Sequence, residues 1–132
     1  MRVQSPKENF PEVGTVANPA ALYDGDDAFV CYEASGRMGG GNVVLKFNGD
    51  IDFRITPMTV EGLGKCRYPV KPWAFNEVID VEETDQWKAL NPRLWLMSFN
   101  DVMIEILFET VSLITHGPHG DPQHKTLVSV LR

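Results

Sequence analysis

Several residue types that often identify a protein at first sight are scarce in this 132-residue sequence. Its two cysteines, Cys31 and Cys66, are too far apart for a C-x-x-C metal or redox pair. No apolar run approaches the ~20 residues that a membrane-spanning helix needs; the longest candidate, 102–114, is interrupted by Glu105 and Glu109. The first residues lack the apolar segment of a secretory signal. We therefore expect a cytoplasmic protein with reduced thiols and no membrane contact.

Basic residues are also in the minority, with 12 Lys and Arg against 18 Asp and Glu and a formal net charge of −6. Nucleic-acid binding depends on concentrated positive charge, so no nucleic-acid partner is expected. The remaining composition, 43% hydrophobic and 23% charged, is typical of a globular protein that can bury one core without metal or disulfides.

Sequence signatures of catalysis and cofactor binding are missing too. The glycine-rich stretch 35–42 lacks the Lys-Ser/Thr of a P-loop and the G-x-G-x-x-G spacing of a dinucleotide site. No serine stands in a G-x-S-x-G frame. Cys31 falls inside a strand pattern, and Lys65 and Arg67 would activate Cys66 only if that thiol is exposed. We expect no cofactor, and the sequence favours a protein without enzymatic activity.

What the sequence does contain is a series of short alternating runs separated by Gly, Asn and Asp turns. These runs predict a mostly β (α+β) protein. It would be a single twisted antiparallel sheet of about five to seven strands, or a partial barrel or sandwich, with one short helix. Parallel pairing is not expected, because long helical crossovers are lacking. Residues 1–15 are predicted to form an extended N-terminal arm, and residues 16–132 a single globular domain.

The first predicted hairpin joins the runs 43–47 and 51–55 through Asn48 and Gly49, because Asn-Gly is a strong turn signal. Register follows the face that becomes buried. A three-residue loop sets apolar residues opposite one another, with Val43, Leu45 and Phe47 facing Ile55, Phe53 and Ile51.

The second predicted hairpin joins 94–99 and 102–108 through a two-residue loop. This loop places three apolar pairs on one face: Phe99 with Val102, Met97 with Ile104, and Trp95 with Ile106. More polar residues fall on the other face, so we expect a half-buried sheet with solvent on that side.

Helix signals are fewer. The best helix candidate is 80–90, which opens with the capping-box pair Asp80 and Glu83. The segment 18–22 also has the pattern of a helix start, limited to about one turn by the Asp-Gly sequence that follows. The apolar end 126–131 is expected to form an edge strand.

An acidic run flanked by tryptophans is the strongest candidate for a binding surface. Its carboxylates fall within nine residues that contain no Lys or Arg. Such runs are usually solvated faces, and tryptophans usually pack in cores. The alternative is an interface in which aromatic anchors supply affinity and charge selects a basic partner protein. The predicted partner-binding residues are Glu77, Asp80, Glu82, Glu83, Asp85, Trp73 and Trp87.

All three histidines lie in one short stretch near the C-terminus. Imidazole and carboxylate groups are ligands of zinc and other transition metals. The weak metal-site candidates are His116, His119, Asp121 and His124. The stretch is rich in Gly and Pro and its spacing matches no metal motif, so a solvated loop is the competing interpretation.

Three functions follow as hypotheses. The first is a non-enzymatic protein-binding module; an immunity-type protein that neutralises a toxin is a concrete case, similar in size and charge only. The second is a small-ligand-binding or hydrolytic barrel-like domain, which requires a pocket lined by buried polar groups such as Glu105, Arg54 or Tyr32. The third is metal binding by the histidine loop.

Overall fold

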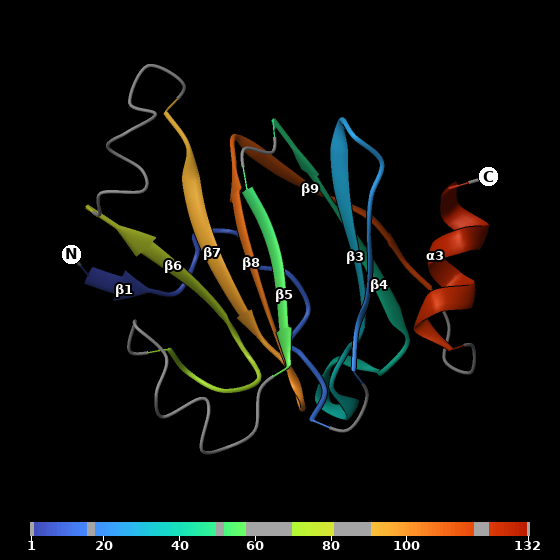
Figure 1. Ribbon diagram of the computed structural model, residues 1–132. Helices are drawn as coiled ribbons and strands as arrows, with labels where there is room; N and C mark the ends of the chain where they lie inside the picture. Colours follow the sequence, from blue (N-terminus) through green and yellow to red (C-terminus); the bar gives the residue numbers. More distant parts are fainter. Residues whose placement is uncertain are drawn as a thin grey trace.

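The structure is a computed structural model that describes residues 2–15, 18–49, 52–57, 70–80, 91–117 and 122–131. Over these residues the chain forms two antiparallel β-sheets and one α-helix (Figure 1). The five-stranded sheet has the strand order β1-β6-β7-β8-β5, with bounds Arg2–Gln4, Phe75–Ile79, Arg93–Ser98, Val102–Phe108 and Asp52–Pro57. The four-stranded sheet has the order β2-β3-β4-β9, with bounds Ala20–Tyr23, Asp27–Glu33, Asn42–Asn48 and Thr110–His116. Helix α3 spans Gln123–Leu131, and a short 3-10 helix spans Gly36–Met38.

Side chains from both sheets meet in one main hydrophobic core. β3 and β4 contribute from one side and β7 and β8 from the other, with the buried residues Ala28, Val30, Tyr32, Val43, Leu45, Phe47, Trp95, Met97, Phe99, Ile104, Ile106 and Phe108. The prediction of a mostly β, antiparallel fold with one short helix is confirmed. Among the predicted alternatives, the sandwich forms rather than the single sheet.

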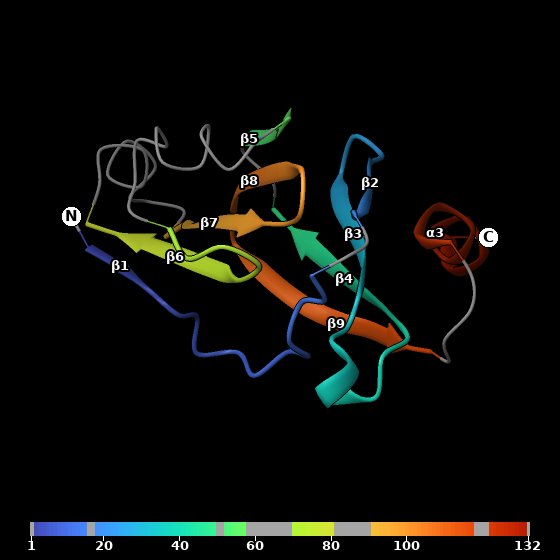
Figure 2. The ribbon, with the colours of Figure 1, turned by 90° about the horizontal axis from the view of Figure 1, so that it is seen from below.

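Two segments of the chain, 42–57 and 102–116, each contribute one strand to each sheet. β4 pairs with β9 in the four-stranded sheet, and their continuations β5 and β8 pair in the five-stranded sheet. The second segment turns at Glu109, whose amide donates a hydrogen bond to the carbonyl oxygen of Asn48 at 3.0 Å. We call Asn48, Gly49, Phe108 and Glu109 the corner; Figure 2 shows β8 and β9 on its two sides. Strands that bend between sheets are typical of orthogonally packed sandwiches.

The first predicted hairpin is therefore wrong. β4 and β5 do not pair with each other: Leu45 lies opposite Leu113, and Phe53 lies opposite Ile106. The predicted inward residues of β4 are nevertheless fully buried in the main core. β4 pairs with the distant strand β9, which has the same apolar alternation, and not with its neighbour β5. The Asn-Gly sequence lies at the corner and does not form a hairpin turn.

The second predicted hairpin is confirmed in its register. Trp95 lies opposite Ile106, and the amide of Phe99 donates to the carbonyl oxygen of Val102 at 2.9 Å across the turn. Its other face, however, is not open to solvent as expected. A second cluster is buried there, formed by Val78, Leu94, Leu96, Met103 and Leu107 with Val3 and Val70 packed against it. β7 is buried on both faces, which explains its nearly continuous apolar sequence.

The C-terminal segment that was expected to form an edge strand is the helix α3. Leu127 and Val130, three residues apart, pack against a cluster on the outer face of the four-stranded sheet that includes Cys31. The side chain of Asn42 donates to Thr126 Oγ1 at 2.8 Å and so anchors the first turn of the helix. β-Branched residues favour a strand here, but docking of one helical face on the sheet decides the outcome.

The predicted helix start at 18–22 is also wrong, because the chain forms β2 there. Asn18 does not cap a helix. Its side chain donates to Asp101 Oδ2 at 3.1 Å and accepts from the Asp101 amide at 2.9 Å, which ties it to the turn between β7 and β8. The predicted helix 80–90 lies outside the described residues except for Asp80, a bend residue with a φ of 58°.

The N-terminal residues 2–15 contact both sheets (Figure 2). β1 pairs with β6 at the edge of the five-stranded sheet. Farther along, the Tyr32 hydroxyl donates to the carbonyl oxygen of Pro11 at 2.6 Å, and Val13 forms a β-bridge with Ala34. Glu8 lies on this path between the two attachments, with a side chain that is 17% exposed.

Gly49→Ala is expected to destabilise the protein more than Gly25→Ala. Both glycines have a positive φ, 67° and 98°, so either alanine would enter a left-handed conformation that costs about 1–2 kcal/mol. Only at residue 49 would the added Cβ also meet the Glu109 Cβ, at 2.9 Å; nothing lies within 4 Å of a Cβ at residue 25. Urea unfolding measures both changes, and equal losses of stability would contradict the steric role of Gly49.

Candidate functional site

The structure separates the residues that were predicted to form an acidic binding face. Trp73 is 38% exposed and Asp80 is exposed, as a binding role requires. Glu77 is only 8% exposed, because the alternation along β6 turns it toward the interior, so it does not contribute to an exposed face. The other predicted residues lie outside the described part of the chain: Glu82, Glu83, Asp85 and Trp87.

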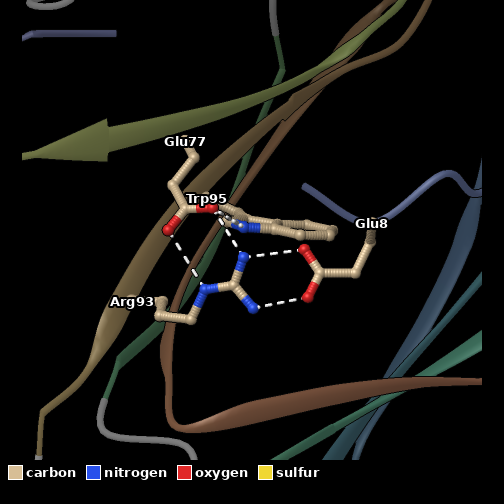
Figure 3. Close-up of polar contacts among 4 residues, drawn as sticks. All are labelled: Glu8, Glu77, Arg93 and Trp95. Carbon is tan, nitrogen blue, oxygen red and sulfur yellow. Dashed lines mark hydrogen bonds and ion pairs between the residues drawn. The ribbon is translucent and has the colours of Figure 1, made fainter. Parts of the chain in front are cut away.

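Glu77 belongs instead to a buried charged cluster, drawn in Figure 3, that we call the Arg93 cluster: Glu8, Glu77, Arg93 and Trp95. The guanidinium of Arg93 donates to the two oxygens of Glu8 at 2.7 Å each. It also donates to Glu77, from Nε at 3.0 Å and from Nη2 at 2.6 Å. The indole N–H of Trp95 donates to Glu77 Oε1 at 3.1 Å.

The electrostatics of the Arg93 cluster favour fixed charges. The hydrogen bond from Arg93 lowers the pKa of Glu8, although burial opposes the shift, and the two glutamates raise the pKa of Arg93 above its usual value. The guanidinium carbon lies 5.6 Å from the ring centroids of both Trp95 and Phe108, within cation–π range. A general acid or base needs a pKa near the working pH. The pKa of Glu8 is shifted the other way, and its two hydrogen bonds with Arg93 hold the N-terminal arm in place.

Sequence reasoning missed Glu8 and Arg93. Arg93 carried a usable signal, since strand alternation puts it on the same face as Trp95 and Met97. A charge on a buried face requires a partner. Glu8 carried no such signal, because it lies in a polar arm 85 residues from Arg93.

Trp73 occupies a turn that is organised by the buried side chain of Asn76. The Asn76 carboxamide accepts a hydrogen bond from the amide of Lys71 at 2.8 Å. It donates to the carbonyl oxygens of Lys71, Ala74 and Leu96 at 3.2, 3.3 and 3.2 Å. The turn holds Trp73 at a φ of 49°, a left-handed conformation that is rare for a bulky residue. Such strain persists only where the surroundings enforce it, and it is concentrated at functional sites.

Beside this turn lies a cleft of about 240 Å³ between the N-terminal arm and the start of β6. We call it the Trp73 cleft. Glu12, on its arm side, is half-exposed and has one long contact, 3.9 Å, with the exposed Arg37. Aromatic and acidic side chains share its lining, among them Phe10, Trp73, Phe75, Glu8 and Glu12. The cleft therefore combines an aromatic surface with negative charge, and of the predicted partner-binding residues Trp73 is among those that line it.

The two histidine candidates that the structure describes lie on different elements. His116 ends β9, and its Nε2 is 2.7 Å from the carbonyl oxygen of Gly40; His124 lies exposed on α3. His119 and Asp121 lie outside the described residues. Among the residues that are described, no group of three or more His, Cys, Asp or Glu side chains could hold a metal ion.

The residues proposed to line a ligand pocket do not meet in one place. Tyr32 lies in the main core, where burial raises its pKa, and Arg54 is 59% exposed and paired with Asp52 at 3.1 Å. Glu105 lies opposite Leu96, on the side of the five-stranded sheet away from the main core. Cys31 is fully buried, and burial raises the pKa of its thiol to about 12, so it is not a nucleophile.

Compared with known proteins, the chain matches no family model, no curated protein and no solved structure. Within the described ranges, no helix is long and apolar enough to cross a membrane.

Glu8→Gln is expected to lower stability at neutral pH and to have little effect in acid. The folded-state pKa of Glu8 lies below its ordinary value of 4.5. Its contribution is therefore present above that value and is lost as the pH falls through the folded-state pKa. Urea unfolding of both proteins from pH 7 to about pH 3 measures the difference.

Glu12→Gln is the matched control for Glu8→Gln. Its long contact with Arg37 is exposed, and such surface pairs contribute about 0–1 kcal/mol. A Glu8→Gln effect that keeps the same size at every pH would show that the lost charge is not responsible.

Trp73→Gly is expected to be more stable than Trp73→Ala, by roughly 1 kcal/mol, because only glycine adopts the left-handed conformation without strain. Both variants lose the same ring contacts, so their difference isolates the backbone. Thermal or urea unfolding measures it; the usual order, with alanine the more stable, would mean that residue 73 is not held in this conformation in solution.

Proposed function

We propose that this protein is a non-enzymatic protein-binding module that holds a basic partner protein, with Trp73 as the aromatic anchor of the interface. The observation that carries the proposal is the conformation of Trp73, which is exposed yet held in a strained turn. The buried Asn76 side chain makes three hydrogen bonds with that turn, one accepted from the Lys71 amide and two donated to the carbonyl oxygens of Lys71 and Ala74. A tryptophan that served only the core would be better accommodated in relaxed backbone and out of solvent.

The surroundings of Trp73 support a basic partner. Glu12 lies in the same cleft, and the whole chain carries a net charge of −6. Exposed Asp80 and the predicted residues Glu82, Glu83 and Asp85 follow β6 directly along the chain. Complementary charge accelerates association and discriminates among partners, whereas a buried aromatic anchor supplies most of the affinity.

The arrangement of the described residues is easier to reconcile with binding than with catalysis. Glu8, one of the carboxylates that line the cleft, is paired with Arg93. An immunity-type protein that neutralises a basic toxin remains a concrete case of this function. A cytoplasmic location belongs to the same proposal and is consistent with the buried, unpaired thiol of Cys31.

The test is quantitative affinity capture of a partner from a cell lysate. The tagged protein is the bait, and the captured material is washed at low and then at high salt. A stoichiometric partner is expected at low salt and should weaken at high salt, because screening reduces attraction between exposed charges. Trp73→Ala is expected to reduce affinity for that purified partner by roughly 10-fold or more, the effect of truncating an interface anchor. Reversing the charges of Glu82, Glu83 and Asp85 to Lys should mainly reduce the association rate.

Leu22→Ala is the matched control, because Leu22 is similarly exposed, at 43%, but lies on β2 in the other sheet. Binding that survives Trp73→Ala, or that Leu22→Ala weakens equally, would refute the assignment of Trp73. Failure to retain any partner at low salt would refute the proposed function itself.

A further inference from the structure

The edges of the two sheets differ in a way that singles out one strand. A sheet edge presents unpaired backbone N–H and C=O groups, which natural proteins protect with charges, prolines or short strands. The β5 edge carries an ion pair between Arg54 and Asp52 and ends at Pro57. β1 has three residues and β2 has four. These edges are poor templates for a further strand.

The edge formed by β9 is neither short nor protected by charges or prolines, and its one irregularity is a β-bulge in its pairing with β4. Its seven residues, TVSLITH, contain no proline, lysine, arginine or carboxylate. Along the described chain, β9 pairs only with β4 and leaves its other side at the end of the sheet. Leu113 and Ile114 are 40% and 43% exposed. Neutral segments of this length and strong β-propensity readily pair with another strand.

Two features leave room for such pairing. Helix α3 packs on the cluster formed by β3 and β4, away from the β9 edge (Figure 1). The pairing of β4 with β9 shifts register between Val44 and Leu45, so that Ile114 has no partner in β4.

We propose that the outer edge of β9 pairs antiparallel with β9 of a second copy of this chain, which joins the two four-stranded sheets across a two-fold axis. An antiparallel strand pair is self-complementary about such an axis. It brings Glu109, just before the strand, toward His116 of the second copy at the strand's other end. Residues 110–115, which form the strand pair between these ends, carry no charge. Two acidic chains therefore meet there without repulsion between like charges.

A second copy fits this edge better than an unrelated peptide does. The carboxylate of Glu109 and the imidazole of His116 lie at opposite ends of β9. In an antiparallel pair of copies, each carboxylate therefore lies near an imidazole of the other copy. Because the other edges in the described part of the chain are short or charged, the assembly closes at two copies rather than growing.

The test is the mass of the full chain in solution, measured by sedimentation or light scattering from about 1 to 100 µM, a range that brackets common dimer affinities. The protein is expected to be a dimer at the upper concentrations. Ile114→Lys should raise the dissociation constant at least tenfold, because each copy would place a lysine in the uncharged strand pair, opposite Val111 of the other copy. Ile55→Lys is the matched control, since Ile55 is 49% exposed on the β5 edge and should not affect the dimer.

Hydrogen exchange of the unmodified protein provides a second readout that does not depend on the folding of a variant. The amides of β9 are expected to gain protection as concentration rises, while those of β5 do not. A protein that stays monomeric throughout this range, a dimer that survives Ile114→Lys, or concentration-dependent protection confined to another edge would each overturn the proposal.

Discussion

The passage of two paired strands through the corner is the constraint on which the rest of this structure depends. Since β8 is followed directly by β9, and their partners β5 and β4 are also consecutive strands, the same two parts of the chain pair with each other in both sheets. This continuity sets which faces of the sheets meet, and it brings Phe47 and Phe108 together with ring centroids 4.9 Å apart. The corner tolerates no side chain at residue 49, where the backbone of one strand approaches Glu109 of the other. The main core and the Trp95 ring within it follow from that geometry.

The Arg93 cluster shows how a charged group can organise a sandwich of this kind. Burying an ion pair costs desolvation energy that offsets much of the attraction, whereas removing one partner leaves a charge without its compensation. Its clearer consequence is specificity. The guanidinium of Arg93 donates to both oxygens of Glu8 in one orientation, and this contact fixes the path of the N-terminal arm. Because Glu8 and Glu12 stand on that arm, the same contact shapes one wall of the Trp73 cleft.

Local patterns in the sequence predicted local features well. The alternation of β7 and β8, joined by a two-residue turn, was sufficient to place Trp95 opposite Ile106. Prediction failed where partners are distant. The apolar period of β4 is compatible with β5 or with β9, and only the whole fold chooses between them. Glu77 illustrates the same limit within the candidate site: in the sequence it belongs to an acidic run, but its inward position depends on Arg93, 16 residues away, and on Glu8. Trp73 was predicted as an anchor because tryptophan is common at interfaces. The strained turn that distinguishes it depends on hydrogen bonds of Asn76 that no sequence pattern predicts.

The long reach of the N-terminal arm has a consequence for how the chain acquires its structure during synthesis. Glu8 leaves the ribosome 85 residues before Arg93, and Pro11 leaves before Tyr32, so the arm is made first but finds its attachment sites late. Pairing of β4 with β9 likewise waits until Thr110–His116 has been translated. Contacts between residues so distant in sequence slow folding, because the entropy of closing long loops is lost before the contacts form. Until β9 has been translated, the apolar strands of the nascent chain are exposed to incorrect pairing, which chaperone binding would prevent.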